Sequence, residues 1–273
     1  MYGTVIVSSG MLLPMKQHQQ SQWTWQWNHL QDDNRWLFSE WIFPNTWETF
    51  RGKTVLDCGC GGGQHVSFVA PVAKSVVGVD LNATESAIQR TKNYQNVRIL
   101  QDDIAKMQLN TVFDVVYSIG VLHHTDDPDA SFANIASHCA AGGRVIVWVY
   151  SKEGNFLNQY VLEPVKYLII RHLPRRMVLW LAWILTLLVS LPVHTIYRLP
   201  LRSLPYYQYF QNWRQLSLSR NMLNVFDKLN APQTWFISEE RIRRWFGSGF
   251  RDVHISPYRG VSWRGSGTRL EHA

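Results

Sequence analysis

The stretch Thr54-Val-Leu-Asp57-Cys-Gly59-Cys-Gly61-Gly-Gly63 decides the fold of this chain. Its first half is short and apolar, which predicts a buried strand, and its second half reads D-x-G-x-G-x-G. Glycines in such a loop let the backbone turn sharply and approach a ligand without a Cβ in the way. A dinucleotide fingerprint needs G-x-G-x-x-G, but Gln64 and Val66 stand where the third glycine should fall. The stretch therefore predicts a ligand-binding turn after a strand, for a ligand other than a dinucleotide.

Short apolar runs recur after this loop and alternate with helical segments. We expect strands at 75–80, 97–101, 113–118 and 144–150, and helices at 84–93 and 127–139. A further helix at 238–246 precedes two short strands at 253–256 and 261–263. Strands that alternate with helices predict a parallel sheet with helices on both faces. The fold class is therefore α/β, a Rossmann-like, doubly wound, mostly parallel seven-stranded sheet with a helical insertion before the last two strands.

Composition divides the chain into four parts. These are an N-terminal aromatic cap (1–50), a ligand-binding core (51–150), an apolar and basic helical insertion (151–236), and a helix with strands that complete the sheet (237–273). The net charge of +7 is unevenly placed, because residues 1–149 carry −3 and residues 150–273 carry +10. No acidic residue occurs between Glu163 and Asp227. The excess positive charge therefore belongs to the insertion and not to the glycine loop.

The insertion contains the one long apolar run of the sequence, residues 177–193. As a helix it would be about 25 Å long, which is short for a bilayer core of about 30 Å. Strands that must rejoin the sheet follow it, and a single crossing would place them on the wrong side of a membrane. We expect the run either to be buried or to lie on a membrane surface, without crossing one. The N-terminus lacks a positive region before its apolar residues, unlike a signal peptide, so the expected location is the cytoplasm.

Acidic residues end the second and third predicted strands. Asp80 lies 23 residues after Asp57, where a carboxylate can accept hydrogen bonds from both hydroxyls of a ribose. Asp102 and Asp103 follow the third strand, where a carboxylate reaches the exocyclic amine of an adenine. Ligands of such sheets bind beyond the carboxyl ends of the strands, so the glycine loop and these acids predict one nucleoside site.

Together with Ser118-Ile-Gly-Val-Leu-His-His-Thr125 after the fourth strand, these residues resemble the class I S-adenosylmethionine-dependent methyltransferases. The resemblance is closest to the branch that methylates small molecules and includes quinone-biosynthesis C-methyltransferases, and it covers about residues 50–150. It implies an enzyme with S-adenosylmethionine as cofactor, the glycines at its methionine end, Asp80 at its ribose and Asp103 at its adenine. The cofactor-binding residues that it implies are Asp57, Gly59, Cys60, Gly61, Gly63, Asp80, Leu81, Asp102, Asp103, Ile104, Ser118 and Ile119.

His123 and His124 are the candidate catalytic residues. Methyl transfer from a sulfonium is an in-line displacement that needs mainly alignment, and needs a base only where the acceptor carries a proton. Adjacent helical residues point about 100° apart, so we expect at most one of the two to face the pocket. The signature of amino-methyltransferases, Asp or Asn followed by Pro-Pro and an aromatic residue, is replaced by Ser118-Ile-Gly-Val121, which disfavours amines of DNA or glutamine as acceptors. No metal site is expected, because the cysteines beside the glycines have no His or Cys partner nearby.

Aromatic residues indicate where the acceptor would bind. Trp23, Trp25 and Trp27 resemble an aromatic N-terminal element that closes over the cofactor in related enzymes, and a structural aromatic cluster is the equal alternative. The insertion is cationic, aromatic and apolar, as an interfacial helix on anionic lipid would be. A helical lid buried on the core is the other interpretation, and both can hold together.

Three functions are compatible with these patterns. The first is methyl transfer to a small, lipophilic or lipid-linked acceptor, with peripheral contact to an anionic membrane. The second is a membrane-peripheral protein that binds S-adenosylmethionine without catalysis. The third is an RNA methyltransferase, which rests on charge alone. Nucleic acid is not the expected partner, because the positive region is also the most apolar one.

Overall fold

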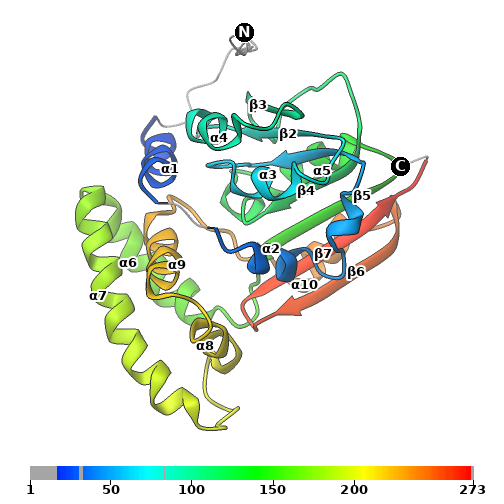
Figure 1. The fold of residues 1–273 in the computed structure, drawn as a ribbon. Coiled ribbons are helices and arrows are strands. Elements are labelled where there is room, and N and C mark those ends of the chain that lie inside the picture. Colours follow the sequence, from blue (N-terminus) through cyan, green and yellow to red (C-terminus); the bar gives the residue numbers. More distant parts are fainter. Residues whose placement is uncertain (1–16, 31–32, 83, 272–273) are drawn as a thin grey trace.

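The computed structural model describes residues 17–30, 33–82 and 84–271, and a seven-stranded sheet runs through its centre (Figure 1). The strands lie in the order β3-β2-β1-β4-β5-β7-β6, and β7 is antiparallel to both of its neighbours. The predicted mostly parallel α/β sheet is confirmed. The strands are β1 (Thr54–Cys58), β2 (Ser75–Asp80), β3 (Val97–Gln101), β4 (Phe113–Ile119), β5 (Cys139–Tyr150), β6 (Phe250–Tyr258) and β7 (Ser262–Arg269).

Helices cover both faces of the sheet. One face packs against α2, α3 and α4 through residues such as Phe38, Val66 and Ala87, and the other packs against α5 and α10 through Phe132 and Ile242. The α-helices are α1 (Gln17–His29), α2 (Arg35–Ile42), α3 (Gln64–Val69), α4 (Thr84–Thr91), α5 (Pro128–Ser137), α6 (Glu163–Leu168), α7 (Arg175–His194), α8 (Tyr207–Trp213), α9 (Leu218–Asn230) and α10 (Glu239–Trp245). Short turns of other helix types are η1 (Trp47–Thr49), η2 (Leu122–His124), η3 (Asn158–Leu162), η4 (Ile170–His172) and η5 (Ile196–Arg198).

Three strands are longer than the sequence predicts. β5 begins at Cys139, which pairs with Phe113 before a shift of register, and Gly142 takes a positive φ of 73° in this irregular stretch. β6 and β7 pair with each other over most of their lengths, and β7 also pairs with β5. Polar residues such as Arg264 interrupt the apolar pattern of these strands, so hydropathy alone placed their ends too close together.

The insertion folds as a helical layer beside the sheet (Figure 1). Its own apolar cluster joins Val178 and Ala182 of α7 to Met222, Phe226 and Leu229 of α9. The two ends of the insertion meet, because Ser151 and Ile237 form a parallel bridge. The chain therefore leaves the sheet at β5 and returns beside it before the last two strands, as predicted.

The N-terminal helices have different positions. α2 packs into the core of the sheet with Phe38 and Ile42 fully buried. α1 instead bridges the sheet and the insertion, because Thr24 Oγ1 donates to the carbonyl of Asn82 (3.2 Å) and Gln26 Nε2 donates to Asp227 Oδ1 (2.9 Å). α1 therefore lies between the end of β2 and the insertion.

Candidate active site

The glycine loop is held in a conformation that other residues rarely adopt. Gly59, Gly61 and Gly63 have φ values of 88°, 51° and 77°. A Cβ on Gly59 would lie 2.4 Å from Val121 Cγ1, and one on Gly61 would lie 2.9 Å from Trp27 Cε2. Positive φ and this close approach both require glycine. The loop is therefore a tight cradle with Trp27 of α1 packed over it.

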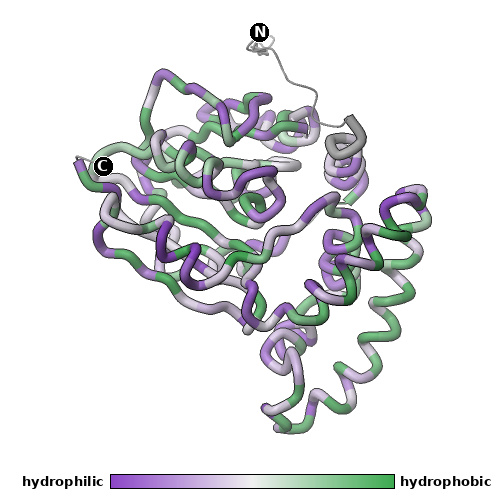
Figure 2. The backbone as a smooth tube through the Cα atoms, turned by 180° about the vertical axis from the view of Figure 1, so that it is seen from behind, coloured by the Kyte–Doolittle hydropathy of each residue, from purple (hydrophilic) through white to green (hydrophobic). Residues whose placement is uncertain are grey.

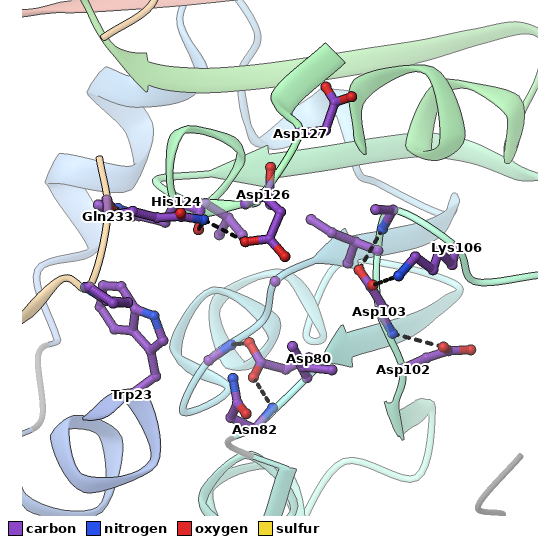
Figure 3. A pocket seen from close by; sticks show the side chains of 18 of the residues that line it. Trp23, Asp80, Asn82, Asp102, Asp103, Lys106, His124, Asp126, Asp127 and Gln233 are labelled. Carbon is purple, nitrogen blue, oxygen red and sulfur yellow. Dashed lines mark hydrogen bonds and ion pairs between the residues drawn. The ribbon is translucent and has the colours of Figure 1, made fainter. Parts of the chain in front are cut away.

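Asp80 fixes the loop to the end of β2. Its Oδ2 accepts a hydrogen bond from the amide of Gly61 (2.9 Å), and its Oδ1 accepts one from the amide of Asn82 (2.8 Å; Figure 3). Each carboxylate oxygen can accept more than one hydrogen bond. The side chain is thus oriented by backbone groups at the edge of the loop.

The loop and Asp80 open into a cavity of about 290 Å³ at the carboxyl ends of the strands. Trp23 and His124 lie on one side of this cavity, and Asp103 and Lys106 lie on the other (Figure 3). The charged residues of its wall are Asp80, Asp102, Asp103, Lys106, Asp126 and Asp127. Five carboxylates against one ammonium favour a cationic ligand and disfavour a phosphate. A glycine cradle, an oriented ribose acceptor and an acidic wall fit S-adenosylmethionine, which carries a sulfonium and an ammonium.

Most of the predicted cofactor residues line this cavity. They are Gly59, Gly61, Asp80, Leu81, Asp102, Asp103 and Ile104. Asp103 Oδ1 accepts from the amide of Ala105 (2.9 Å) and its Oδ2 lies 3.5 Å from Lys106 Nζ. Asp102 Oδ1 accepts from the amide of Asp103 (2.7 Å). Both acids of the pair are therefore at the wall, at the end where the resemblance places the adenine.

Other predicted residues lie outside the cavity. Asp57 is buried beneath the loop and accepts a hydrogen bond from the Tyr117 hydroxyl (2.9 Å). Its burial raises its pKa to about 8, despite that hydrogen bond. Ser118 is also buried and donates to the Cys58 carbonyl (2.8 Å), and Gly63 is the N-cap residue of α3. Cys60 and Ile119 line a neighbouring cavity described below.

The three tryptophans of α1 separate. Trp23 and Trp27 line the cofactor cavity, and Trp23 lies 5.1 Å from the His124 ring. Trp25 instead packs against His29 and Phe226, with ring centroids 4.3 and 5.5 Å away. In a helix, residues 23 and 27 are four positions apart and lie on the same face, whereas residue 25 points to the other side. Trp25 therefore holds α1 on the insertion instead of facing the cavity.

The two histidines also separate. His124 lines the cavity, and the carbonyl of Gln233 lies 2.9 Å from its Nδ1. Because a carbonyl can only accept, Nδ1 carries the proton and Nε2 keeps a lone pair. Burial lowers the pKa of His124. His124 is therefore a neutral imidazole at neutral pH, in the form that can take a proton.

His123 is fully buried, and neither of its ring nitrogens has a hydrogen-bond partner among the described residues. Its ring packs 4.2 Å from those of both His124 and Tyr150. Burial, assisted by His124 and Lys228, lowers its pKa well below 6.5. The side chain of His123 therefore packs in the interior and does not face the cavity, so it is not placed to exchange a proton with a ligand there.

His123→Leu is expected to reduce the acid sensitivity of the fold. Below about pH 6.5 the unfolded chain takes up a proton at His123 and the folded chain does not. The free energy of unfolding therefore decreases as the pH is lowered through this range, by up to about 1.4 kcal/mol per pH unit. Between pH 7.5 and pH 5.5, the free energy of unfolding of the leucine variant should decrease by about 1.4 kcal/mol less than that of wild type, as measured by denaturant unfolding. Between pH 7.5 and 8.5, where His123 is neutral in both states, the difference between the proteins should stay constant. Equal acid sensitivity of the two proteins would contradict the assignment.

Several residues of the cavity wall were not among the predicted site residues. Lys106, Gly120, Val121, Asp126 and Asp127 are neighbours of predicted positions and could have been found by extending each strand end. Pro232 and Gln233 could not, because they come from the end of the insertion, far away in sequence. Gln233 Nε2 donates to Asp126 Oδ1 (2.8 Å), which closes the cavity between core and insertion.

A second cavity of about 230 Å³ lies between the sheet and the insertion. Its aromatic residues are Trp41, Trp148, Tyr150, Tyr206, Tyr209, Phe210, Trp213 and Tyr258. A smaller cavity of about 140 Å³ connects it to the cofactor cavity. This junction shares Gly59, Gly61 and Val121 with the cofactor cavity and Trp148 and Tyr150 with the aromatic one. The three cavities therefore lie next to one another, in a row from the glycine loop to the insertion.

A family model matches the core of the chain. The family model described as "Methyltransferase domain" matches residues 56–147. A tRNA U34 carboxymethyltransferase of Haemophilus influenzae is 31% identical over 121 residues, covering 42% of this chain and 37% of that protein. An uncharacterized protein of Synechococcus is 30% identical over 129 residues, covering 42% of this chain and 31% of that protein. The chain thus spans about a third of the length of these curated relatives.

Among solved structures, the N-methyltransferase NodS from Bradyrhizobium japonicum WM9 is similar with a TM-score of 0.49 and 13% identity, covering 88% of this chain and all of that one. The family match coincides with the glycine loop, Asp80, the Asp102–Asp103 pair and His124. Residues 56–147 therefore match a methyltransferase domain over the stretch that supplies most of the cavity wall.

Proposed function

We propose that this protein is an S-adenosylmethionine-dependent methyltransferase whose acceptor is a small, lipophilic molecule held between the sheet and the insertion. The observation that carries the proposal is the row of adjoining cavities from the glycine loop to the aromatic cavity. An acceptor in the aromatic cavity would reach the methionine end of the cofactor site through the junction. Such an arrangement would hold two bound molecules close together and aligned for transfer.

The chemistry divides between the cofactor and the chain. When bound, S-adenosylmethionine supplies a methyl group on a good leaving group. The chain supplies the two aligned cavities and, where the acceptor carries a proton, a base. His124 Nε2 is the group placed for that task, because Nδ1 is directed to the Gln233 carbonyl. His123 is excluded from the task by its burial behind Tyr150.

The walls of the second cavity favour an aromatic or otherwise apolar acceptor that carries an acidic group. Trp148 and Tyr150 end β5, and the ring-rich helix α8 faces them. On α9, Arg220, Asn224 and Lys228 also line this cavity. They are spaced four residues apart, so they lie one turn apart on one face of the helix. A carboxylate or phosphate on the acceptor would meet a cation at either end of that face, where Arg220 and Lys228 lie about two turns apart.

RNA is the alternative acceptor, suggested by the printed names of several relatives. The exposed cations of the insertion stand among exposed leucines, isoleucines and tryptophan, which is atypical of an RNA-binding surface. The cavity cations Arg220 and Lys228 lie against aromatic rings, with Lys228 Nζ 5.5 Å from the Tyr150 ring centroid and 5.2 Å from that of Tyr209. We therefore favour a small molecule as the acceptor, as in the branch of the family that includes quinone-biosynthesis C-methyltransferases.

The test is transfer of tritium from labelled S-adenosylmethionine to a panel of phenolic, quinol and enol acids, with bulk tRNA in a parallel reaction. The proposal expects label in a small acceptor and none in tRNA. Label in tRNA alone would establish the RNA alternative. Cofactor binding with no transfer to any acceptor would support a binding protein without catalysis.

Removing the cavity cations should change acceptor selectivity. Lys228→Met combined with Arg220→Gln is expected to raise the KM for an acidic acceptor about tenfold or more, because charge-assisted hydrogen bonds are lost. The KM for the methyl ester of the same acceptor should change little, so the ratio of the two values is the measurement. S-adenosylhomocysteine affinity is the control for intact folding. A similar rise in KM for acid and ester would remove the acidic group from the proposal.

A further inference from the structure

α7 presents a continuous apolar face to the outside of the protein. The outward residues are Met177, Trp180, Ile184, Leu187, Leu188 and Leu191, which are 53–71% exposed. Between Arg176 and His194, every exposed side chain of this helix is apolar. In Figure 2, α7 is hydrophobic along most of its length and stands at the edge of the molecule.

The geometry of the helix separates two apolar faces. At 3.6 residues per turn, the six outward residues fall within an arc of about 100°. Val178, Ala182, Thr186 and Val193 fall on the opposite side and are buried, where α7 packs on α9. Packing within the protein therefore explains the inner face of α7, and no partner for the outer face occurs in the part of the chain that the structure describes.

Positive charge stands at both ends of this face. Arg171 and Arg176 are exposed at the beginning of α7, and Arg198 and Arg202 are exposed just beyond its end. No acidic residue is present in the sequence from residue 164 to 226 to neutralise them. An apolar strip of about 22 Å with cations at its ends complements an anionic membrane, whose headgroups attract arginine while its acyl region accepts leucine and tryptophan.

We infer that the outer face of α7 docks this protein on an anionic membrane surface, with the helix lying in the plane of the interface. Length and composition alone would let α7 cross a bilayer. Its inner face, however, is fixed along α9, and the bridge between Ser151 and Ile237 returns the chain to the sheet. A helix held in this way meets a membrane with its side and not with its end.

The inference goes beyond the proposed function and can be tested without an acceptor. It also bears on that function, because Val189 of α7 lines the aromatic cavity. The element that would touch the lipid is therefore also a wall of the acceptor cavity.

Flotation with vesicles tests the surface. The full chain should float with vesicles of phosphatidylcholine and phosphatidylglycerol, and float much less with phosphatidylcholine alone. Trp180→Glu combined with Leu188→Glu should lower the partition coefficient about tenfold or more, since carboxylates would face both the acyl region and the anionic headgroups. Val112→Glu combined with Val253→Glu adds the same charge at exposed apolar positions outside the insertion and should float like wild type.

Three results would overturn the inference. One is equal flotation of the two double variants. Another is a stable dimer in solution that the α7 variant dissociates, because the face would then be an interface between two copies. The third is resistance of the membrane-bound protein to alkaline carbonate, which would indicate a crossing helix. S-adenosylhomocysteine binding should be the same in both double variants, so loss of membrane binding and loss of the cofactor site can be told apart.

Discussion

Asp80→Ala is expected to weaken S-adenosylhomocysteine binding about 100-fold or more. Two hydrogen bonds from ribose hydroxyls to a carboxylate are worth about 1.5–3 kcal/mol each, and about 2.8 kcal/mol corresponds to a factor of 100. The same side chain also accepts from the amides of Gly61 and Asn82, so its removal loosens the loop that holds the methionine end. Isothermal calorimetry with the purified protein measures the change directly.

Asp102→Ala is the matched control for this prediction. It removes a carboxylate from the same cavity wall, but the one contact of its Oδ1 is with the adjacent amide of Asp103. We expect its effect on affinity to be about threefold or less, as for a partly exposed local hydrogen bond. Equal losses in the two variants would show that the acidic wall acts by total charge. An unchanged affinity in Asp80→Ala, with the melting temperature preserved, would remove the ribose assignment.

His124→Gln is expected to lower kcat about 100-fold or more for an acceptor that must lose a proton. General-base catalysis typically contributes a factor of about 10²–10⁴. The pKa of His124 is lowered by burial, so the neutral base is present at pH 7 and above. Wild-type activity should therefore be flat above neutrality and fall only in acid, as pH drops through this lowered pKa. The glutamine variant should lose that acid limb.

Steady-state kinetics on an acceptor from the tritium screen measures this effect. The KM for S-adenosylmethionine should stay within about threefold, because a base that acts only in the transition state does not hold the ground state. His123→Leu serves as the neighbouring control and should retain most of the turnover. If His124→Gln keeps both the rate and the pH profile of wild type, the reaction needs no base at this position, and alignment in the two cavities accounts for transfer.

The cofactor side of the site was readable from local sequence. β1, the glycines after it and Asp80 are contiguous or lie at strand ends, and parallel strands bring such ends to one edge. The conformation of the loop depends on short-range backbone geometry, because Gly59 and Gly61 have positive φ values that glycine adopts readily and other residues rarely adopt. Asp57 shows the limit of this approach, because its position in the motif did not reveal that its side chain points beneath the loop to Tyr117.

The acceptor side was decided by tertiary structure. Nothing local says that Trp148 and Tyr150 of β5 face α8 and α9 across a cavity, because those helices come more than fifty residues later. The choice between His123 and His124 likewise depends on Gln233, which binds one of them from the end of the insertion.

By itself, the sequence determined an α/β sheet with its cofactor loop and acids, an acid-free insertion, and an apolar run at 177–193. The tertiary structure decided which face of that run is buried on α9 and which remains outside. Hydropathy could not make that distinction, because both faces of α7 are apolar, and burial depends on which helix packs against it. For the same reason, only the structure shows the aromatic cavity in which we propose that the acceptor binds.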